Sequence, residues 1–365
     1  MGKRDFQPPR SEPRRVKAID LFCGVGGLTL GLRRAGWDVV TGIDVDATAE
    51  ATYRSNNPRT AFVPADLRNL TDRAIRETAS AIRSEDLLLA GCAPCQPFSK
   101  QRRNGQFKRP GEATLLGEFA RAVRVLRPKV VLMENVPGIA TVPGFSSFRR
   151  FVKSLRTNGY RCGHGVLNAS DFGVPQHRRR YVLLAAHSSD ATLPIPAAGS
   201  SLDVATVRSA IERFPEIEAG ESHPSVPNHS AAKLSALNLE RIRVTPVDGG
   251  SWRDWPEELV LRCHRNTSGF SDVYGRMWWD RVAPTLTSRC NSLSNGRFGH
   301  PDQHRAISLR EAAALQTFPD DYVFFGSQNS IARWIGNAVP VSFAEALGRA
   351  AMTAVVGCES ASFSP

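Results

Sequence analysis

KAIDLFCGVGGLTLGLRRAGWDVVTGIDVD, residues 17–46, is the stretch of sequence that decides the fold. Its first six residues form a short apolar run that predicts a buried strand. A glycine-rich turn then leads into a helix that we expect to end near Gly36. The stretch closes with a second strand that has an acidic end. Strand, glycine turn, helix and strand in this order predict the first unit of a parallel α/β sheet.

The glycine turn itself suggests a ligand site. Glycines let the backbone approach a ligand closely, and the helix start offers unpaired N–H groups. The order here is Gly24-x-Gly26-Gly27, which lacks the third glycine of the dinucleotide-binding fingerprint. The turn alone is therefore weak evidence, and a plain tight turn remains an alternative.

The alternation of strands and helices continues along the chain. We expect helices over 47–57, 118–127 and 148–160, and strands beginning at 61 and 85, ending at Glu134, and spanning 178–186. This pattern predicts a doubly wound, mostly parallel sheet with helices on both faces. Ligands of such sheets bind outside the carboxyl ends of the strands.

The character of the sequence changes after residue 186. The next hundred residues are irregular and rich in Gly, Pro and Ser, and helical periodicity returns over 308–324 and 330–356. We expect a disordered basic tail over 1–16, a catalytic and cofactor-binding domain over 17–186 plus 328–360, and a smaller irregular domain over 187–327. The last helix is expected to return to the first domain.

Composition and charge narrow the class of protein. The 365 residues have a net charge of +12, which favours a polyanionic partner such as nucleic acid. Seven scattered cysteines argue against a disulfide framework and suit a reducing compartment. No apolar run is long enough to cross a bilayer, and the N-terminus lacks a secretory signal. We therefore expect a cytoplasmic protein without a membrane partner.

Acidic residues follow three successive strands. Asp44 and Asp46 end the second strand, where a carboxylate can bind ribose hydroxyls, and Asp66 follows the third, where it could accept a hydrogen bond from an exocyclic amine. Each alone could be a solvated loop residue. Together they favour an adenosine-type cofactor.

The segment GCAPCQPFS, residues 91–99, carries the chemistry. Cys92 and Cys95 have the spacing of a thiol redox pair, but Pro97 crowds the helix start that such a pair needs. A zinc site would require a second ligand pair at standard spacing, which the other cysteines and histidines do not provide. We expect no metal, and one working nucleophile.

At this point a resemblance is evident. The motifs PCQPFS, MENVPG and QHRRR, behind DLFCGVGG and ahead of IGNAVP, resemble those of the DNA cytosine-5 methyltransferase family, bacterial type. The shared motifs run from Ile19 to Ala344. The resemblance implies a Rossmann-like methyltransferase sheet, S-adenosylmethionine as cofactor, and methylation of C5 of a specific cytosine in double-stranded DNA.

The resemblance assigns the catalytic residues. Cys95 is the nucleophile that adds to C6 of the cytosine, Glu134 holds or donates a proton at N3, and Arg180 donates to O2. Arg178 steadies the site. Cys92 has no counterpart in the family motif and is interpreted as a buried small residue.

The resemblance also assigns the cofactor site. Phe22 stacks on the adenine, Asp44 holds the ribose, and Asp66 reads the adenine amine. The further cofactor residues are Gly24, Gly26, Gly27, Val45, Leu115, Asn337 and Val339. Val45 stands where the family often has a large aromatic residue, so stacking on that face is expected to be aliphatic.

A cytosine inside a duplex must be flipped out before Cys95 can reach it. Residues 97–112 carry five Lys or Arg and two glycines, which suggests a lid that closes over DNA. The predicted DNA contacts are Gln96, Ser99, Lys100, Arg102, Arg103 and, in the small target-recognition domain, Arg297. The small domain is expected to read the DNA sequence.

Three alternatives remain at this stage: a tRNA cytosine-5 methyltransferase of the same superfamily, a catalytically inactive DNA-binding module, and a thiol oxidoreductase. The favoured interpretation implies a monomer in the bacterial cytoplasm, associated with the nucleoid. It is compatible with a restriction-modification system and a cognate restriction endonuclease.

Overall fold

The structure is a computed structural model that describes residues 16–80, 82–93, 113–141, 146–187, 205–265 and 272–356. Cys95 and the predicted lid fall outside these ranges. The predicted basic tail also falls outside them, except for its last residue, Val16. In the described part of the chain, seven strands form one sheet in the order β3-β2-β1-β4-β5-β7-β6. The strands are β1 Lys17–Leu21, β2 Asp38–Asp44, β3 Ala61–Pro64, β4 Leu87–Gly91, β5 Val130–Asn135, β6 Arg161–Asn168 and β7 Arg179–Ala186.

The prediction of a mostly parallel sheet is confirmed. Strands β1 to β5 pair in parallel. The last two strands depart from this pattern, because β7 runs antiparallel to β5 and pairs with β6 as an antiparallel edge. The sequence analysis missed β6 altogether.

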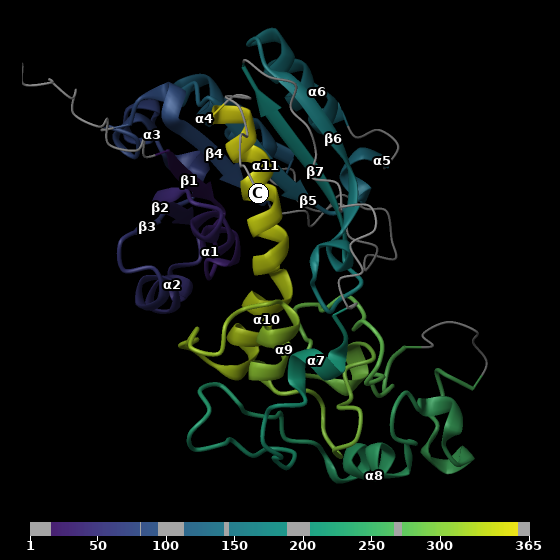
Figure 1. Cartoon of the computed structure of the whole chain (residues 1–365). Coiled ribbons are helices and arrows are strands. Elements are labelled where there is room, and N and C mark those ends of the chain that lie inside the picture. Colours follow the sequence, from purple (N-terminus) through teal and green to yellow (C-terminus); the bar gives the residue numbers. More distant parts are fainter. Residues whose placement is uncertain are drawn as a thin grey trace, which may run out of the picture.

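Helices cover both faces of the sheet (Figure 1). The helices are α1 Gly27–Arg34, α2 Glu50–Asn56, α3 Asp72–Glu77, α4 Ala113–Leu126, α5 Gly138–Thr141, α6 Ser146–Thr157, α7 Val207–Ile211, α8 Ala236–Val244, α9 Leu309–Leu315, α10 Gln328–Asn337 and α11 Val341–Val356. Helices α4 and α6 bury Phe119 and Phe151 against one face. Helices α1 and α11 bury Leu32 and Phe343 against the other.

The alternation of side chains along each strand produces these two layers. In β1, Ala18 faces α1 and α11, whereas Ile19 faces α4 and α6. The central strand β4 is buried over its whole length, as expected for a parallel strand covered on both sides. The sheet is therefore held rigidly, and its carboxyl-end loops carry the site.

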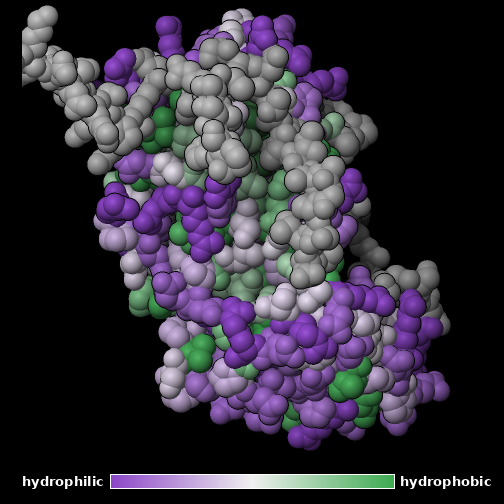
Figure 2. All heavy atoms as spheres, viewed as in Figure 1, coloured by the Kyte–Doolittle hydropathy of each residue, from purple (hydrophilic) through white to green (hydrophobic). Residues whose placement is uncertain are grey.

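Residues 205–265 and 272–327 form the lower part of the molecule and contain little regular structure (Figure 1). Their surface is largely hydrophilic in the space-filling view (Figure 2). Buried polar groups take the place of a sheet in organising the loops. Arg276, fully buried, donates hydrogen bonds to the carbonyl oxygens of Thr245, Ile242, His300 and Gln303.

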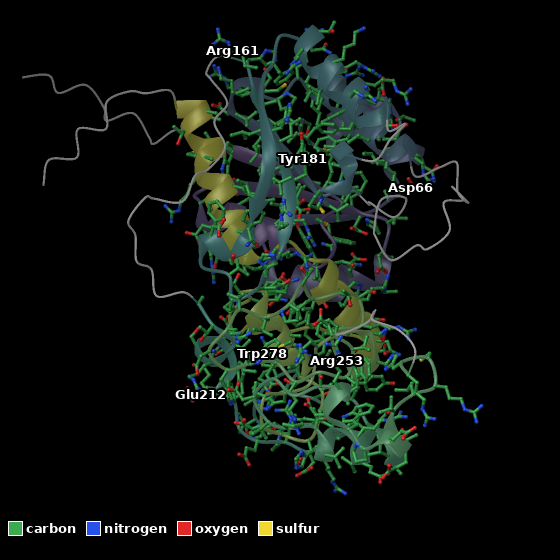
Figure 3. All side chains as sticks on the ribbon, turned by 90° about the vertical axis from the view of Figure 1, so that its right-hand side faces the viewer. Asp66, Arg161, Tyr181, Glu212, Arg253 and Trp278 are labelled. Atoms are coloured by element: carbon green, nitrogen blue, oxygen red, sulfur yellow. The ribbon has the colours of Figure 1, made fainter. Side chains whose placement is uncertain are left out.

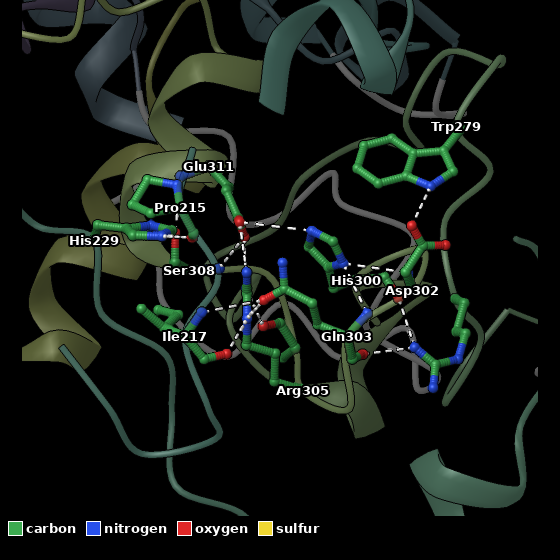
Figure 4. A network of polar contacts seen from close by, with 12 residues as sticks. Pro215, Ile217, His229, Trp279, His300, Asp302, Gln303, Arg305, Ser308 and Glu311 are labelled. Atoms are coloured by element: carbon green, nitrogen blue, oxygen red, sulfur yellow. Dashed lines mark hydrogen bonds and ion pairs between the residues drawn. The ribbon is translucent and has the colours of Figure 1, made fainter. Parts of the chain in front are cut away.

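A second buried network contains an ion pair (Figure 4). Both nitrogens of the Arg305 guanidinium fork lie 2.7 Å from the Glu311 carboxylate oxygens. The same carboxylate accepts from the backbone N–H of Ser308, which caps α9. The network thus joins α9 to the loops before it.

The chain returns to the sheet through α10 and α11. The predicted helical stretch over 330–356 is interrupted at Ala338–Pro340, because Pro340 has no N–H to donate. Helix α11 packs along α1, so the last helix returns to the N-terminal part of the chain as predicted. No helix in the described ranges is both long enough and apolar enough to span a bilayer.

Candidate active site

The glycine turn after β1 adopts a tight conformation that needs its glycines. Gly24 and Gly26 have positive φ angles of 51° and 91°, a region that side chains disfavour. A Cβ atom on Gly27 would lie 2.5 Å from the carbonyl oxygen of Val339. The turn therefore packs directly against the chain segment that returns between α10 and α11.

A pocket opens beside this turn at the carboxyl ends of β1, β2 and β3. It is lined by Leu21, Phe22, Ile43, Asp44, Val45, Ala65, Asp66, Leu67, Arg68 and Leu115. Five predicted cofactor residues thus lie around one cavity: Phe22, Asp44, Val45, Asp66 and Leu115. The other five, Gly24, Gly26, Gly27, Asn337 and Val339, are not part of its lining, although Gly24 contacts the lining residue Asp44 through its backbone N–H.

The pocket lining combines the apolar faces and the hydrogen-bond acceptors that an adenosine group requires. Val45 is 68% exposed, which is unusual for a large aliphatic residue and leaves an apolar face open at the pocket. Phe22 provides an aromatic ring, and two carboxylates provide acceptors. The residues present therefore fit S-adenosylmethionine, with an aliphatic face at Val45 in place of an aromatic one.

Asp44 is held in place by the backbone. One carboxylate oxygen accepts from the N–H of Gly24 and the other from the N–H of Asp46, both at 2.8 Å. Burial raises the pKa of Asp44, while these hydrogen bonds oppose the shift. Each oxygen retains a lone pair for a hydroxyl donor such as a ribose.

Asp46 has a different role from Asp44. Its carboxylate accepts hydrogen bonds from Trp334 and Arg333 of α10 and from the following Thr48. It thereby joins the loop after β2 to α10. Because Asp46 contacts α10 and Asp44 lines the pocket, Asp44 is the candidate for binding the ribose.

The sequence analysis missed Arg68, which lines the pocket next to Asp66. Its guanidinium contacts both oxygens of the Asp66 carboxylate at 2.5 to 3.0 Å. The hydrogen bond from Arg68 lowers the pKa of Asp66, so this carboxyl is ionised at neutral pH. Only the three-dimensional fold of the turn brings this pair to the pocket.

Glu134 lies at the end of β5, with 2% of its side chain exposed. The Nε atom of Arg180 is 2.9 Å from one carboxylate oxygen. The Cys92 thiol donates to the other oxygen at 2.7 Å. The predicted pair of Glu134 and Arg180 is therefore in direct contact, on the α1–α11 face of the sheet.

The interpretation of Cys92 as a buried small residue is incomplete, because Cys92 packs against the α1–α11 core cluster and also has a polar partner. Cys92 is half-buried, follows β4 directly, and has the Glu134 carboxyl as its partner. Next to it, the Asn135 side chain donates to the carbonyl oxygen of Ala93 at 2.9 Å. These contacts fix the start of the segment that leads to Cys95, which itself lies outside the described residues.

Arg178 is buried away from this pair. Its guanidinium donates to the carbonyl oxygens of Leu286, Gly336 and Ala338 at 3.0 to 3.1 Å. Arg178 thereby connects the start of β7 to the irregular region and to the end of α10. This contact network suits the steadying role that the resemblance implied.

Arg297 is the one predicted DNA contact that the structure describes. Only 7% of it is exposed, and its guanidinium donates to the backbone carbonyls of Gly249 and Arg276 and lies 4.1 Å from the Trp278 ring centre. This placement argues against the predicted contact with DNA bases. Gln96, Ser99, Lys100, Arg102 and Arg103 lie outside the described residues. Among the described residues no cluster of three or more His, Cys, Asp or Glu could hold a metal ion.

Comparisons with known proteins identify the family. The chain is 43% identical over 337 residues to the Type II methylase M.HgiDII of Herpetosiphon aurantiacus, covering 91% of this chain and 92% of that protein. It is 34% identical to the Type II methyltransferase M1.HphI of Haemophilus parahaemolyticus, covering 92% and 86%. Among solved structures, the S. pombe Dnmt2 methyltransferase shares the fold with a TM-score of 0.59 and 19% identity, covering 93% of this chain and 98% of that one. The family model for C-5 cytosine-specific DNA methylases matches residues 16–353, so the chain belongs to this family.

Proposed function

We propose that this enzyme, an S-adenosylmethionine-dependent cytosine-5 DNA methyltransferase, acts on a flipped cytosine through a covalent bond between Cys95 and C6 of the base. One observation carries the proposal. The buried Glu134 carboxyl contacts Arg180 at the sheet edge where β4 leads toward Cys95. An acid and a guanidinium beside a nucleophile form the set of groups that this chemistry needs.

The proposed reaction begins at the base. The Cys95 thiolate adds to C6, and the ring electrons move toward N3 and O2. Glu134 supplies a proton or a hydrogen bond at N3, and Arg180 stabilises the negative charge at O2. C5 thereby becomes nucleophilic. After C5 is methylated, loss of its proton and departure of the thiolate restore the aromatic ring and free Cys95.

The cofactor, when bound, supplies a methyl group on a positively charged sulfur. The proposal places Phe22 against the adenine and Asp44 at the ribose hydroxyls. Asp66 accepts from the adenine amine while it remains paired with Arg68. The backbone around Gly24 and Gly26 admits the amino-acid end, and Gly27, Asn337 and Val339 close the site from the returning segment.

The division of labour along the chain is part of the proposal. Residues 17–186 with 328–360 bind the cofactor and carry out the reaction, and residues 187–327 recognise the target sequence. Residues 97–112 close over the duplex, and Gln96, Ser99, Lys100, Arg102 and Arg103 contact the DNA.

The Type II names of the relatives support a role in restriction-modification with a cognate endonuclease. One copy of the chain contains all these groups, which supports a monomer.

Bisulfite sequencing of DNA from cells that express the chain tests this function. The expected result is methylation of one cytosine within a fixed short sequence, absent in cells that express Cys95→Ser. Labelled methyl transfer to tRNA but not to genomic DNA would contradict the proposal.

A further inference from the structure

A groove lies between α6 and β6, on the sheet face opposite Glu134 and Arg180. It is lined by Phe148, Arg149, Val152, Lys153, Arg156, Thr157 and His164. We call it the α6–β6 groove. Its β6 wall begins near Arg161, which Figure 3 places at the end of the molecule opposite Trp278 and Arg253 of the target-recognition region. The groove is therefore separate from the site described above.

The charge of this region is one-sided. From residue 135 to residue 170 the sequence contains five Lys or Arg and no Asp or Glu. Arg149, Lys153 and Arg156 are exposed, and in the described part of the chain none of them forms an ion pair. This contrasts with the arginines of α2 and α3, Arg54 and Arg73, which pair with carboxylates on their own helices. Three uncompensated cations around one groove favour an anionic ligand.

The spacing of the three cations suits a line of phosphates. Positions i, i+4 and i+7 lie along one face of a helix, and seven residues at 1.5 Å each span about 10 Å. One strand of duplex DNA places a charge about every 3.4 Å along its axis, so this distance corresponds to about three phosphates. A single small anion would not need cations distributed over such a length.

The floor of the groove is rigid and offers another donor. Phe148 and Val152 are buried beneath the cations, and the Phe148 ring packs edge-on against Tyr181. The Tyr181 hydroxyl is 2.7 Å from Nδ1 of His164. When the phenol donates to Nδ1, the imidazole proton lies on Nε2, where it can be donated to a ligand in the groove.

We propose that the α6–β6 groove binds the phosphate backbone of duplex DNA, as a second contact independent of sequence and distinct from the catalytic cleft. Arg149, Lys153 and Arg156 supply the charges, and His164 supplies a hydrogen bond. DNA beyond the target site, or a second segment of the same molecule, is the ligand. Such a contact would keep the enzyme on DNA between target sites.

The test compares two variants with the same change in charge. The groove variant is Arg149→Gln/Lys153→Gln/Arg156→Gln. The control variant is Arg34→Gln/Arg59→Gln/Arg76→Gln, whose three exposed arginines lie at the end of α1, before β3 and in α3. Binding is measured by fluorescence anisotropy against salt concentration, on a duplex of little more than one helical turn and on one of about six turns.

The expected result is specific to the groove and to the long duplex. There the slope of log affinity against log salt becomes shallower by about 2 to 3 for the groove variant, since each phosphate contact contributes about 0.9. The control variant keeps the slope of the unmodified protein. Arg149→Lys/Arg156→Lys, which preserves charge, also keeps it and shows that the fold tolerates substitution here. Methylation of the short duplex is unchanged in every variant.

Two results would overturn the inference. Equal slopes for the groove and control variants on the long duplex would show that DNA does not use the groove, and would leave an acidic protein surface as its partner. Loss of short-duplex methylation in the groove variant would show that the groove belongs to the catalytic cleft. The binding readout needs no methyl transfer, so failure of the proposed chemistry would be seen separately.

Discussion

Both oxygens of the Glu134 carboxyl have a protein partner, and one of these partners is a cysteine. The Cys92 thiol donates to one oxygen, and Arg180 lies at the other. The thiol therefore holds the carboxyl from one side while the Arg180 guanidinium holds it from the other, and Cys92 positions Glu134 in this way.

Replacing Cys92 by alanine should lower kcat about tenfold, which corresponds to the loss of roughly one hydrogen bond to a charged group. KM for the cofactor should not change, because Cys92 is not part of the pocket lining. Cys92→Ser retains a donor and should keep most of the activity. Steady-state kinetics over a range of pH make the measurement. An alanine variant with unchanged kcat and pH profile would show that the contact has no role in catalysis.

Asp20, beneath the glycine turn, should make stability depend on pH. It is fully buried, and its Oδ2 accepts from Thr29 at 2.7 Å while Oδ1 has no hydrogen-bond partner. Burial raises the pKa of Asp20 from 3.8 to about 7, and the nearby Asp44 adds to the shift. The folded state thus holds the proton more tightly than the unfolded state, so stability is lost as pH rises from about 4 through 7.

Asp20→Asn removes this titration. Between pH 5 and pH 8 the free energy of unfolding of the unmodified protein should fall by about 2 to 3 kcal/mol relative to that of the variant. Urea denaturation at both pH values measures the difference. A constant difference across this range would mean that Asp20 is ionised in the folded protein.

Some residues of the candidate site could be predicted from sequence and others could not. Asp44 and Glu134 lie at strand ends, Asp66 follows a strand closely, and parallel strands bring their ends together. Cys92 also follows a strand, but its contact with Glu134 joins residues that are 42 positions apart in the sequence. The contact of Arg68 with Asp66 depends on the conformation of the turn after β3. Arg297 had the residue type of a base-reading arginine but folds back onto its own backbone.

At the scale of elements, the contact between α1 and α11 depends on a small residue. A Cβ atom on Gly31 would meet the Ala344 side chain and lie 2.7 Å from the carbonyl oxygen of Val341. Gly31→Ala should therefore destabilise the protein by about 1 to 3 kcal/mol, because two backbones must move apart.

Gly117 of α4 provides the matched control. A Cβ atom there meets nothing within 4 Å. Gly117→Ala should be neutral or stabilise the fold by up to about 1 kcal/mol through helix propensity. Urea titration of both variants gives the comparison. Equal stabilities would show that α11 can shift away from α1 without cost.

The elements themselves were predicted well where apolar runs are long. β4 and β5 are continuous apolar strands, and α4 and α6 have clear helical periodicity. β6 was missed because its sequence RCGHGVLN has two glycines and no buried stripe. Its strand conformation comes from pairing with β7, and the sequence pattern does not contain that tertiary contact.

At the scale of the whole molecule, the irregular region depends on buried ionic groups. The Arg305–Glu311 pair is at most 1% exposed. Burial opposes ionisation of Glu311, but Arg305 and the nearby His300 lower the pKa of Glu311 overall. Glu311→Gln leaves the Arg305 charge buried without a counterion and should cost about 3 to 5 kcal/mol in stability.

An exposed pair serves as the reference. Glu77→Gln breaks the pair of Glu77 with Arg73, which is exposed on both sides, and should cost at most about 0.5 kcal/mol. Chemical denaturation of the two variants tests the contrast. A similar small effect at Glu311 would show that water reaches the buried network.

The architecture of residues 205–327 could not be derived from the sequence. Its loops are organised by arginines such as Arg276 and Arg310, which donate to carbonyl oxygens that are distant along the chain. Such residues look like surface charges in a sequence. By contrast, the arrangement of one mostly parallel sheet with helices on both faces could be predicted from local periodicity alone.

The central claim is that Cys95 bonds to C6 of the target cytosine. The most direct test incubates the protein and S-adenosylmethionine with a duplex that carries 5-fluorocytosine at the target position, since fluorine at C5 blocks the last proton loss. The account predicts a denaturant-resistant conjugate between protein and DNA, which peptide mapping locates at Cys95 and which is absent for Cys95→Ala. Methylation of the normal duplex without any such conjugate on the fluorinated one would contradict the account.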